Sequence, residues 1–133
     1  MKLPVGTRPG GGPTGGFFPP GHPRWDMIVV ANRFHVDPAH AEEFEQRFRD
    51  RMGEVEDREG FVRFEFHTPV DHGHVETDTH AAVTYWESMA AFENWTESEA
   101  FQEAHRNPPP EEWFTADGGL EIHEVAFDAV GTD

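Results

Sequence analysis

The chain has 133 residues, the size of a single domain built around one hydrophobic core. Its 10 basic and 26 acidic side chains give a formal net charge of −16, which argues against nucleic acids and anionic membranes as partners because both require a cationic face. The lack of cysteine excludes disulfide bonds and thiolate chemistry.

Residues 1–25 form a tail rich in glycine and proline. Such a segment buries too little surface to offset its ordering entropy, so we expect it to be disordered and the folded domain to span residues 26–130. The tail lacks the apolar core of a secretory signal, and no apolar run is long enough to cross a bilayer. We therefore expect a cytoplasmic protein, whose acidic surface suits either a halophilic protein or an ordinary acidic one.

The first expected element is a strand, DMIVVANRFHVD, over residues 26–37. Side chains alternate between the two faces of a strand, and one face here is apolar except at Asn32. An unpaired amide in such a row costs about 1–3 kcal/mol, so Asn32 either has a hydrogen-bonding partner or lines a cavity that a ligand fills. The spacing alone favours the structural partner.

A helix is expected next, because Asp37 suits the N-cap and Pro38 the first helical position. Its regular part is expected to end near Gly53. Its buried face carries apolar residues at spacings of three and four: Ala41, Phe44, Phe48, Met52 and Val55.

Two further strands are expected over residues 60–69 and 79–87, joined by a polar, hairpin-like connection. The second strand presents Val62, Phe64, Phe66 and Thr68 on one face. The connection and its flanks can bind zinc or copper, although their spacing matches no fixed structural site. The side chains concerned are His67, Asp71, His72, His74, Glu76, Asp78 and His80.

Two short helices are expected after the third strand. Ser88 caps the first of them, and Thr96 followed by Glu99 has the form of a capping box that starts the second. The second helix is expected to run to about Arg106 and to end at the three prolines that follow Asn107. The last strand is expected over residues 120–130.

The expected order is β-α-β-β-α-β, which is the ferredoxin-like arrangement of an α+β domain with helices on one face of an antiparallel sheet. The other face needs a cover. A second copy of the sheet is the most economical one, so we expect a homodimer.

Two side chains stand out in the helical region. Trp95 lies at the junction of the two short helices, where a bulky ring usually fills a gap. His105 shares a helix face with Phe101 and points inward. Each alone is more typical of packing than of ligand binding.

Three stretches together resemble the heme-degrading monooxygenases of the Isd type, within the antibiotic biosynthesis monooxygenase superfamily of dimeric α+β barrels. They are ANRFHV at 31–36, RMGEVEDREGF at 51–61 and VTYWESMAAFENWTESEAFQEAH at 83–105. The resemblance runs from about Met27 to about Asn107, and the pair Trp95 and His105 is its most specific part.

The resemblance implies a role for each of three residues. His105 is the expected axial ligand of heme iron, Asn32 the expected hydrogen-bond donor to ligands on the distal side, and Trp95 the expected ring that ruffles the porphyrin. Heme is then both substrate and cofactor, cleaved with O2 and external electrons to release iron. With no dinucleotide fold expected, the electrons come from a separate reductase or a small reductant.

The N-terminal tail and the proline-rich loop after Asn107 have no counterpart in the resemblance. The basic residues offered for the heme propionates are Arg33, Arg63 and Arg106. Two alternatives stay open: a cofactor-free monooxygenase of the same superfamily that oxidises an aromatic polyketide or quinol, and a carrier or sensor that binds heme without degrading it.

Overall fold

The computed structural model describes residues 27–51 and 53–131. The tail expected over residues 1–25 and the helix position expected for Met52 therefore lie outside the described residues. No helix in the described ranges has the length and apolar character needed to cross a membrane.

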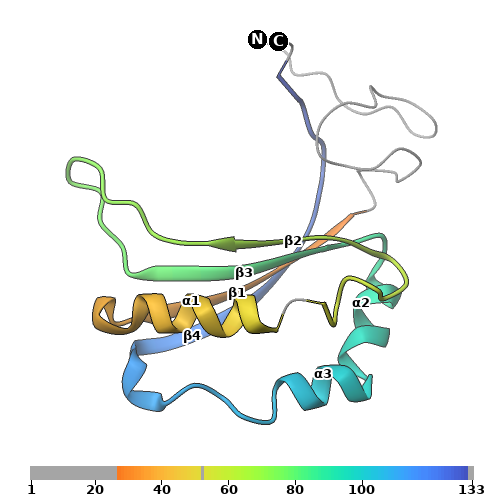
Figure 1. Cartoon of the computed structure of the whole chain (residues 1–133). Coiled ribbons are helices and arrows are strands. Elements are labelled where there is room, and N and C mark those ends of the chain that lie inside the picture. The colour runs from red at the N-terminus through yellow and green to blue at the C-terminus, as the bar shows by residue number, and fades with distance from the viewer. Residues whose placement is uncertain (1–26, 52, 132–133) are drawn as a thin grey trace.

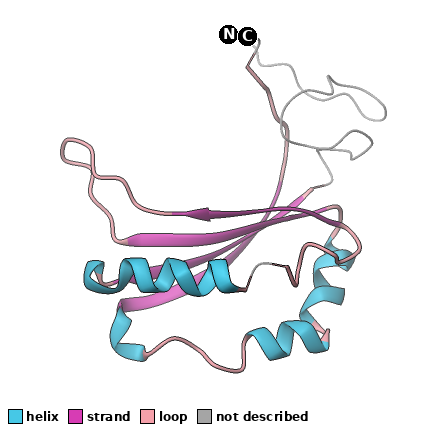
Figure 2. Ribbon diagram, in the orientation of Figure 1, coloured by secondary structure: helices cyan, strands magenta, loops and turns pink. Residues whose placement is uncertain are grey.

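The described residues form an α+β fold in the order that the sequence predicts. Four antiparallel strands make one sheet, in the spatial order β2-β3-β1-β4, and the helices lie on one side of it (Figures 1 and 2). The elements are β1 (Ile28–Val36), η2 (Pro38–His40), α1 (Ala41–Asp50), β2 (Phe61–His67), β3 (Thr79–Trp86), α2 (Met89–Thr96), α3 (Glu99–Ala104), η3 (Glu111–Trp113) and β4 (Phe114–Glu124).

The predicted caps of the first two helical segments are confirmed. The Asp37 side chain accepts a hydrogen bond from the Ala39 amide at 2.9 Å, at the start of η2. The Ser88 hydroxyl oxygen accepts one from the Ala91 amide at 3.2 Å, at the start of α2.

The capping box predicted at Thr96 is wrong. The N-cap of α3 is Ser98, whose hydroxyl oxygen accepts from the Phe101 amide at 3.1 Å. The Thr96 hydroxyl instead donates to the Glu93 carbonyl at 2.8 Å, so Thr96 belongs to the last turn of α2. The helix α3 ends at Ala104, and His105 is its C-cap residue.

Three boundaries also differ from the sequence prediction, and one of them is the end of β4, which lies at Glu124 rather than at Val130. The helix α1 ends at Asp50, so Val55 lies in the irregular segment after it rather than in the helix. The strand β4 starts at Phe114 rather than Leu120, because Phe114 already pairs with Val36 of β1. Pairing across strands overrides the turn-like composition of residues 115–119.

The core beneath the helices has two parts. At one end of the sheet, Trp86 is fully buried and packs with Ile28, Val30 and Trp95. At the other end, Phe44 of α1 is fully buried, with its ring centroid 4.9 Å from that of Phe34. The first part includes Trp95 of α2 and the second includes Phe44 of α1, and a cavity lies between the two parts.

Candidate functional site

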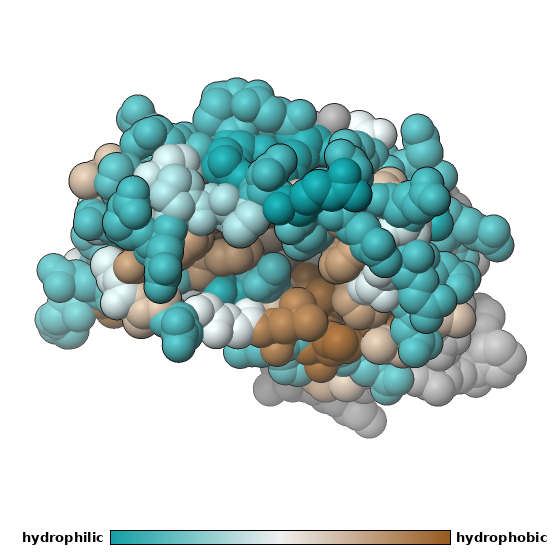
Figure 3. All heavy atoms as spheres, turned by 90° about the horizontal axis from the view of Figure 1, so that it is seen from below, coloured by the Kyte–Doolittle hydropathy of each residue, from teal (hydrophilic) through white to brown (hydrophobic). Residues whose placement is uncertain are grey.

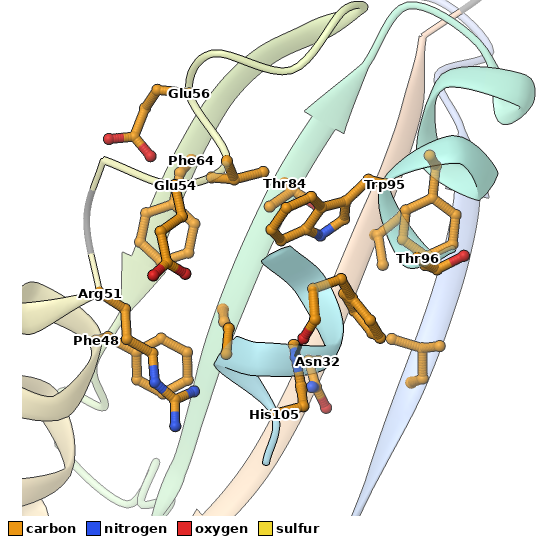
Figure 4. Close-up of a pocket in the computed structure, with 17 residues that line it drawn as sticks. Asn32, Phe48, Arg51, Glu54, Glu56, Phe64, Thr84, Trp95, Thr96 and His105 are labelled. Atoms are coloured by element: carbon orange, nitrogen blue, oxygen red, sulfur yellow. Dashed lines mark hydrogen bonds between the residues drawn. The ribbon is translucent and has the colours of Figure 1, made fainter. Parts of the chain in front are cut away.

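A cavity of about 310 Å³ lies between the sheet and the helices (Figure 4). Its volume is at the lower end of the range of ligand pockets. The sheet, the end of α1, the segment after α1 and both short helices all contribute to its wall. Figure 3 shows apolar side chains gathered around a hollow on the underside of the molecule.

A second hollow of about 560 Å³ adjoins the first. It lies between the proline-rich loop and β4, and its wall includes Pro108, Pro109 and Phe114. Asn32 and Leu120 line both spaces. The two hollows are therefore neighbours that share part of the sheet as their floor.

Asn32 lies in the middle of β1, between Ala82 of β3 and Leu120 of β4. Its side-chain amide makes no hydrogen bond within the part of the chain that the structure describes. The structural partner that the spacing favoured is thus not found there. Of the two arrangements considered for Asn32, the structure shows the one in which the amide lines a cavity.

Trp95 lines the same cavity from the last turn of α2 and is 8% exposed. Its ring meets that of Phe101 edge to face, with centroids 5.6 Å apart. The Arg58 guanidinium lies 5.8 Å from the centroid of the indole. These contacts hold a rigid ring at the cavity wall, as Figure 4 shows.

His105 completes the set at the C-cap of α3, where its ring stacks on Phe101 with centroids 4.1 Å apart. Its Nδ1 atom lies 2.8 Å from the Phe101 carbonyl oxygen. A carbonyl only accepts, so Nδ1 carries the proton and Nε2 of the neutral ring keeps its lone pair. This is the tautomer that binds a metal through Nε2.

The structure therefore brings together all three residues singled out in the sequence, Asn32, Trp95 and His105, around one cavity. The three come from β1, α2 and α3. Their convergence depends on the break at Ser98, which turns α3 back over the sheet (Figure 1).

The arginine that lines the cavity is not one of the three that the sequence analysis named for the heme propionates. Among the lining residues in the described ranges, Arg51 is the only arginine. Burial lowers the pKa of Arg51, the adjacent Arg47 adds to this fall, and Glu54 opposes it. An arginine stays charged nonetheless, and Arg51 shares the cavity wall with the carboxylates of Glu54 and Glu56.

The three arginines expected near the propionates have other partners. Arg33 lies 3.7 Å from Glu121, Arg63 lies 3.2 Å from Glu65, and Arg106 lies 2.8 Å from Glu103. Arg51 could have been found from its position at the end of a helix, one turn after Phe48 on the buried face.

The histidine-rich connection between β2 and β3 does not form a metal centre. No group of three or more suitable side chains capable of holding a metal ion occurs among residues 27–51 and 53–131. His67 instead contacts Glu65 at 3.0 Å, and the buried His80 contacts the Asp78 carbonyl at 3.2 Å.

Comparison with known proteins places residues 27–107 within the family model described as antibiotic biosynthesis monooxygenase. A heme-degrading monooxygenase of Shouchella clausii (strain KSM-K16) is 37% identical over 101 residues, which are 74% of this chain and 90% of that protein. A staphylobilin-producing heme oxygenase of Staphylococcus haemolyticus (strain JCSC1435) is 40% identical over 81 residues, which are 61% of this chain and 75% of that protein.

Among solved structures, the heme-degrader MhuD of Mycobacterium tuberculosis, with two hemes bound in its active site, superposes with a TM-score of 0.61. It is 33% identical, and the match covers 78% of this chain and 99% of that one.

The hydrogen bond between His105 and Phe101 makes a direct prediction about the ring. Long-range proton–nitrogen correlation spectra of the neutral imidazole should show His105 protonated at Nδ1, because only Nδ1 faces the carbonyl oxygen. The signal is assigned by its loss in His105→Gln. A ring protonated at Nε2 would contradict this geometry.

Proposed function

The chain belongs to the antibiotic biosynthesis monooxygenase family, and we propose that it is a heme-degrading monooxygenase that cleaves the porphyrin with O2 and external electrons and releases iron. The observation that carries the proposal is the convergence on one cavity of His105, with its free Nε2 lone pair, and Asn32, with its unpartnered amide. The heme-degrading relatives described above support it.

The residues present fit heme. The cavity wall is largely aromatic and aliphatic, the adjoining hollow extends it, and Arg51 can receive a carboxylate. A bound heme supplies the iron at which O2 is activated. His105 would hold the iron through Nε2, and the Phe101 carbonyl keeps the neutral ring in the tautomer that this requires.

Asn32 places an uncharged polar side chain in a largely apolar cavity, where a charged side chain would be destabilised by desolvation. An amide donor can steer and polarise a reacting oxygen, whereas a charged side chain would pay a large desolvation penalty in an apolar pocket. Because its amide has no partner within the described ranges, it is available for this role. Trp95, packed against Phe101, supplies the rigid surface that distorts the macrocycle.

Hemin added to the heme-free protein, followed by ascorbate in air, tests the function. A Soret band that forms and then bleaches, with iron becoming available to a chelator, is the expected result. A stable band would mean a heme carrier. No band at all would favour the cofactor-free monooxygenase.

Two substitutions separate ligation from the later steps. His105→Ala should abolish turnover because the only proposed iron ligand is lost. Asn32→Ala should slow turnover by about 100-fold while heme affinity changes little, since a single polar donor is removed. Rates under single-turnover conditions and hemin titrations measure both. His67→Ala, an exposed histidine outside the cavity, is the control and should behave as wild type. Full activity of His105→Ala would rule out the assigned ligand.

Arg51 is proposed to bind a heme propionate. Arg51→Ala should weaken hemin binding by about tenfold, because a charge-assisted hydrogen bond in a partly buried place is lost. The same substitution should leave the affinity for hemin dimethyl ester unchanged, since the ester carries no carboxylate. Equal losses for both ligands would mean that Arg51 acts through packing instead.

A homodimer is proposed as the assembled form. The strand β4 has 11 residues at the edge of the sheet, and Leu120 and Ile122 on it are 57% and 42% exposed. A long edge strand that exposes apolar side chains is normally paired or covered. Light scattering in concentrated salt, which screens the net charge of −16, should give twice the chain mass of 15.1 kDa; a monomer mass would contradict this.

A further inference from the structure

The strand β4 is irregular directly beside Asn32. Arg33 of β1 pairs with Gly119, but His35 pairs with Ala116. Two residues of β4, Asp117 and Gly118, therefore lie opposite the single residue Phe34. This is a β-bulge, an arrangement that bends a strand and is common next to functional sites, where it changes the direction of a side chain.

Gly118 is the point of closest approach in this bulge. A Cβ atom added to Gly118 would lie 2.0 Å from the carbonyl oxygen of Arg33 and 3.1 Å from its carbonyl carbon. Both atoms belong to the backbone and cannot turn away as a flexible side chain would. The φ angle of Gly118 is not in the left-handed region, so glycine is needed here for space and not for its dihedral freedom.

The Arg33 carbonyl belongs to the peptide bond between Arg33 and Phe34, one residue further along β1 than Asn32. The Asn32 amide has no hydrogen bond to any other described residue, so no side-chain contact of that kind fixes its direction. Its direction is instead set by the path of β1, and that path runs against Gly118 on the side of β4.

We propose that Gly118 is a positioning residue for Asn32: the bulge allows β1 and β4 to approach closely at Arg33 and thereby aims the Asn32 amide at the reacting centre in the cavity. This inference rests on the proposed function and deepens it. To escape the contact that an added methyl group would make, one strand must move by about 1 Å, and a displacement of that size in a catalytic site can cost about 100-fold in rate.

The adjacent glycine provides a matched control. A Cβ atom added to Gly119 meets no atom within 4 Å. Gly118→Ala and Gly119→Ala thus make the same chemical change at neighbouring positions of one strand. Gly118→Ala should lower kcat by about 10- to 100-fold with hemin affinity nearly unchanged. Gly119→Ala adds its methyl group to open space beside the adjoining hollow and should leave the path of β1 unchanged.

Both rates are measured per bound heme from the Soret absorbance, so a partly unfolded sample does not imitate the effect. Deletion of Asp117, which removes the extra residue and straightens β4, is a second variant and should show the same loss of kcat. Wild-type kcat in Gly118→Ala would overturn the proposal.

A double-mutant comparison separates positioning from general damage. If Gly118 acts through Asn32, then Gly118→Ala should have little further effect on kcat in the Asn32→Ala background. An equal loss in both backgrounds would overturn the proposal. The result does not depend on the absolute size of either effect.

A measurement without heme keeps this inference distinct from the proposed function. The side-chain amide signals of Asn32 in proton–nitrogen spectra should shift in Gly118→Ala and not in Gly119→Ala. Unmoved signals in Gly118→Ala would overturn the positioning role. Shifted signals together with a wild-type protein that leaves hemin intact would instead overturn the proposed function alone.

Discussion

The hydrogen bond from His105 to the carbonyl of Phe101 is the interaction on which the site depends. The helix α3 spans only Glu99–Ala104, and so short a helix is not stable by itself in water. It is held by its ends. Ser98 caps the first turn, and the backbone amide and Nδ1 of His105 both donate to the Phe101 carbonyl, at 3.1 and 2.8 Å. The contact that ends the helix therefore also fixes the tautomer of its imidazole.

The segment after His105 is held by hydrogen bonds from the end of α1. Arg47 of α1 donates to the carbonyl of Asn107 at 2.5 Å, and Arg51 lies 3.4 Å from the same oxygen. These bonds join the end of α1 to the end of α3 across 56 to 60 positions of sequence. His105 is thus positioned by hydrogen bonds on both sides, whereas Asn32 is positioned by the path of a strand. The positions of His105 and Asn32 therefore depend on different parts of the fold.

Much of this arrangement follows from local sequence rules, and the exceptions have clear causes. The order of elements and the caps at Asp37 and Ser88 depend on neighbouring residues, so the sequence predicts them. Ser98 and Thr96 are both residue types that cap helices well, so the local sequence does not decide between them, and Ser98 is the cap in the structure. The start of β4 and its bulge depend on pairing with β1, which leaves no mark in a segment as polar as TADGG.

Charge was the hardest feature to place from the sequence. Arg33 of β1 pairs with Glu121 of β4, a contact that depends on the sheet, whereas Arg63 pairs with Glu65 two residues further along β2. What remains at the cavity is Arg51, in a chain of net charge −16. Such a chain repels an anionic substrate at long range in dilute salt. At about 1 M salt the screening length falls to about 3 Å, so the repulsion is mostly screened, whereas the proposed, partly buried contact with Arg51 would be screened much less. The acidic surface and the cationic Arg51 at the cavity are therefore compatible with an anionic porphyrin as the substrate.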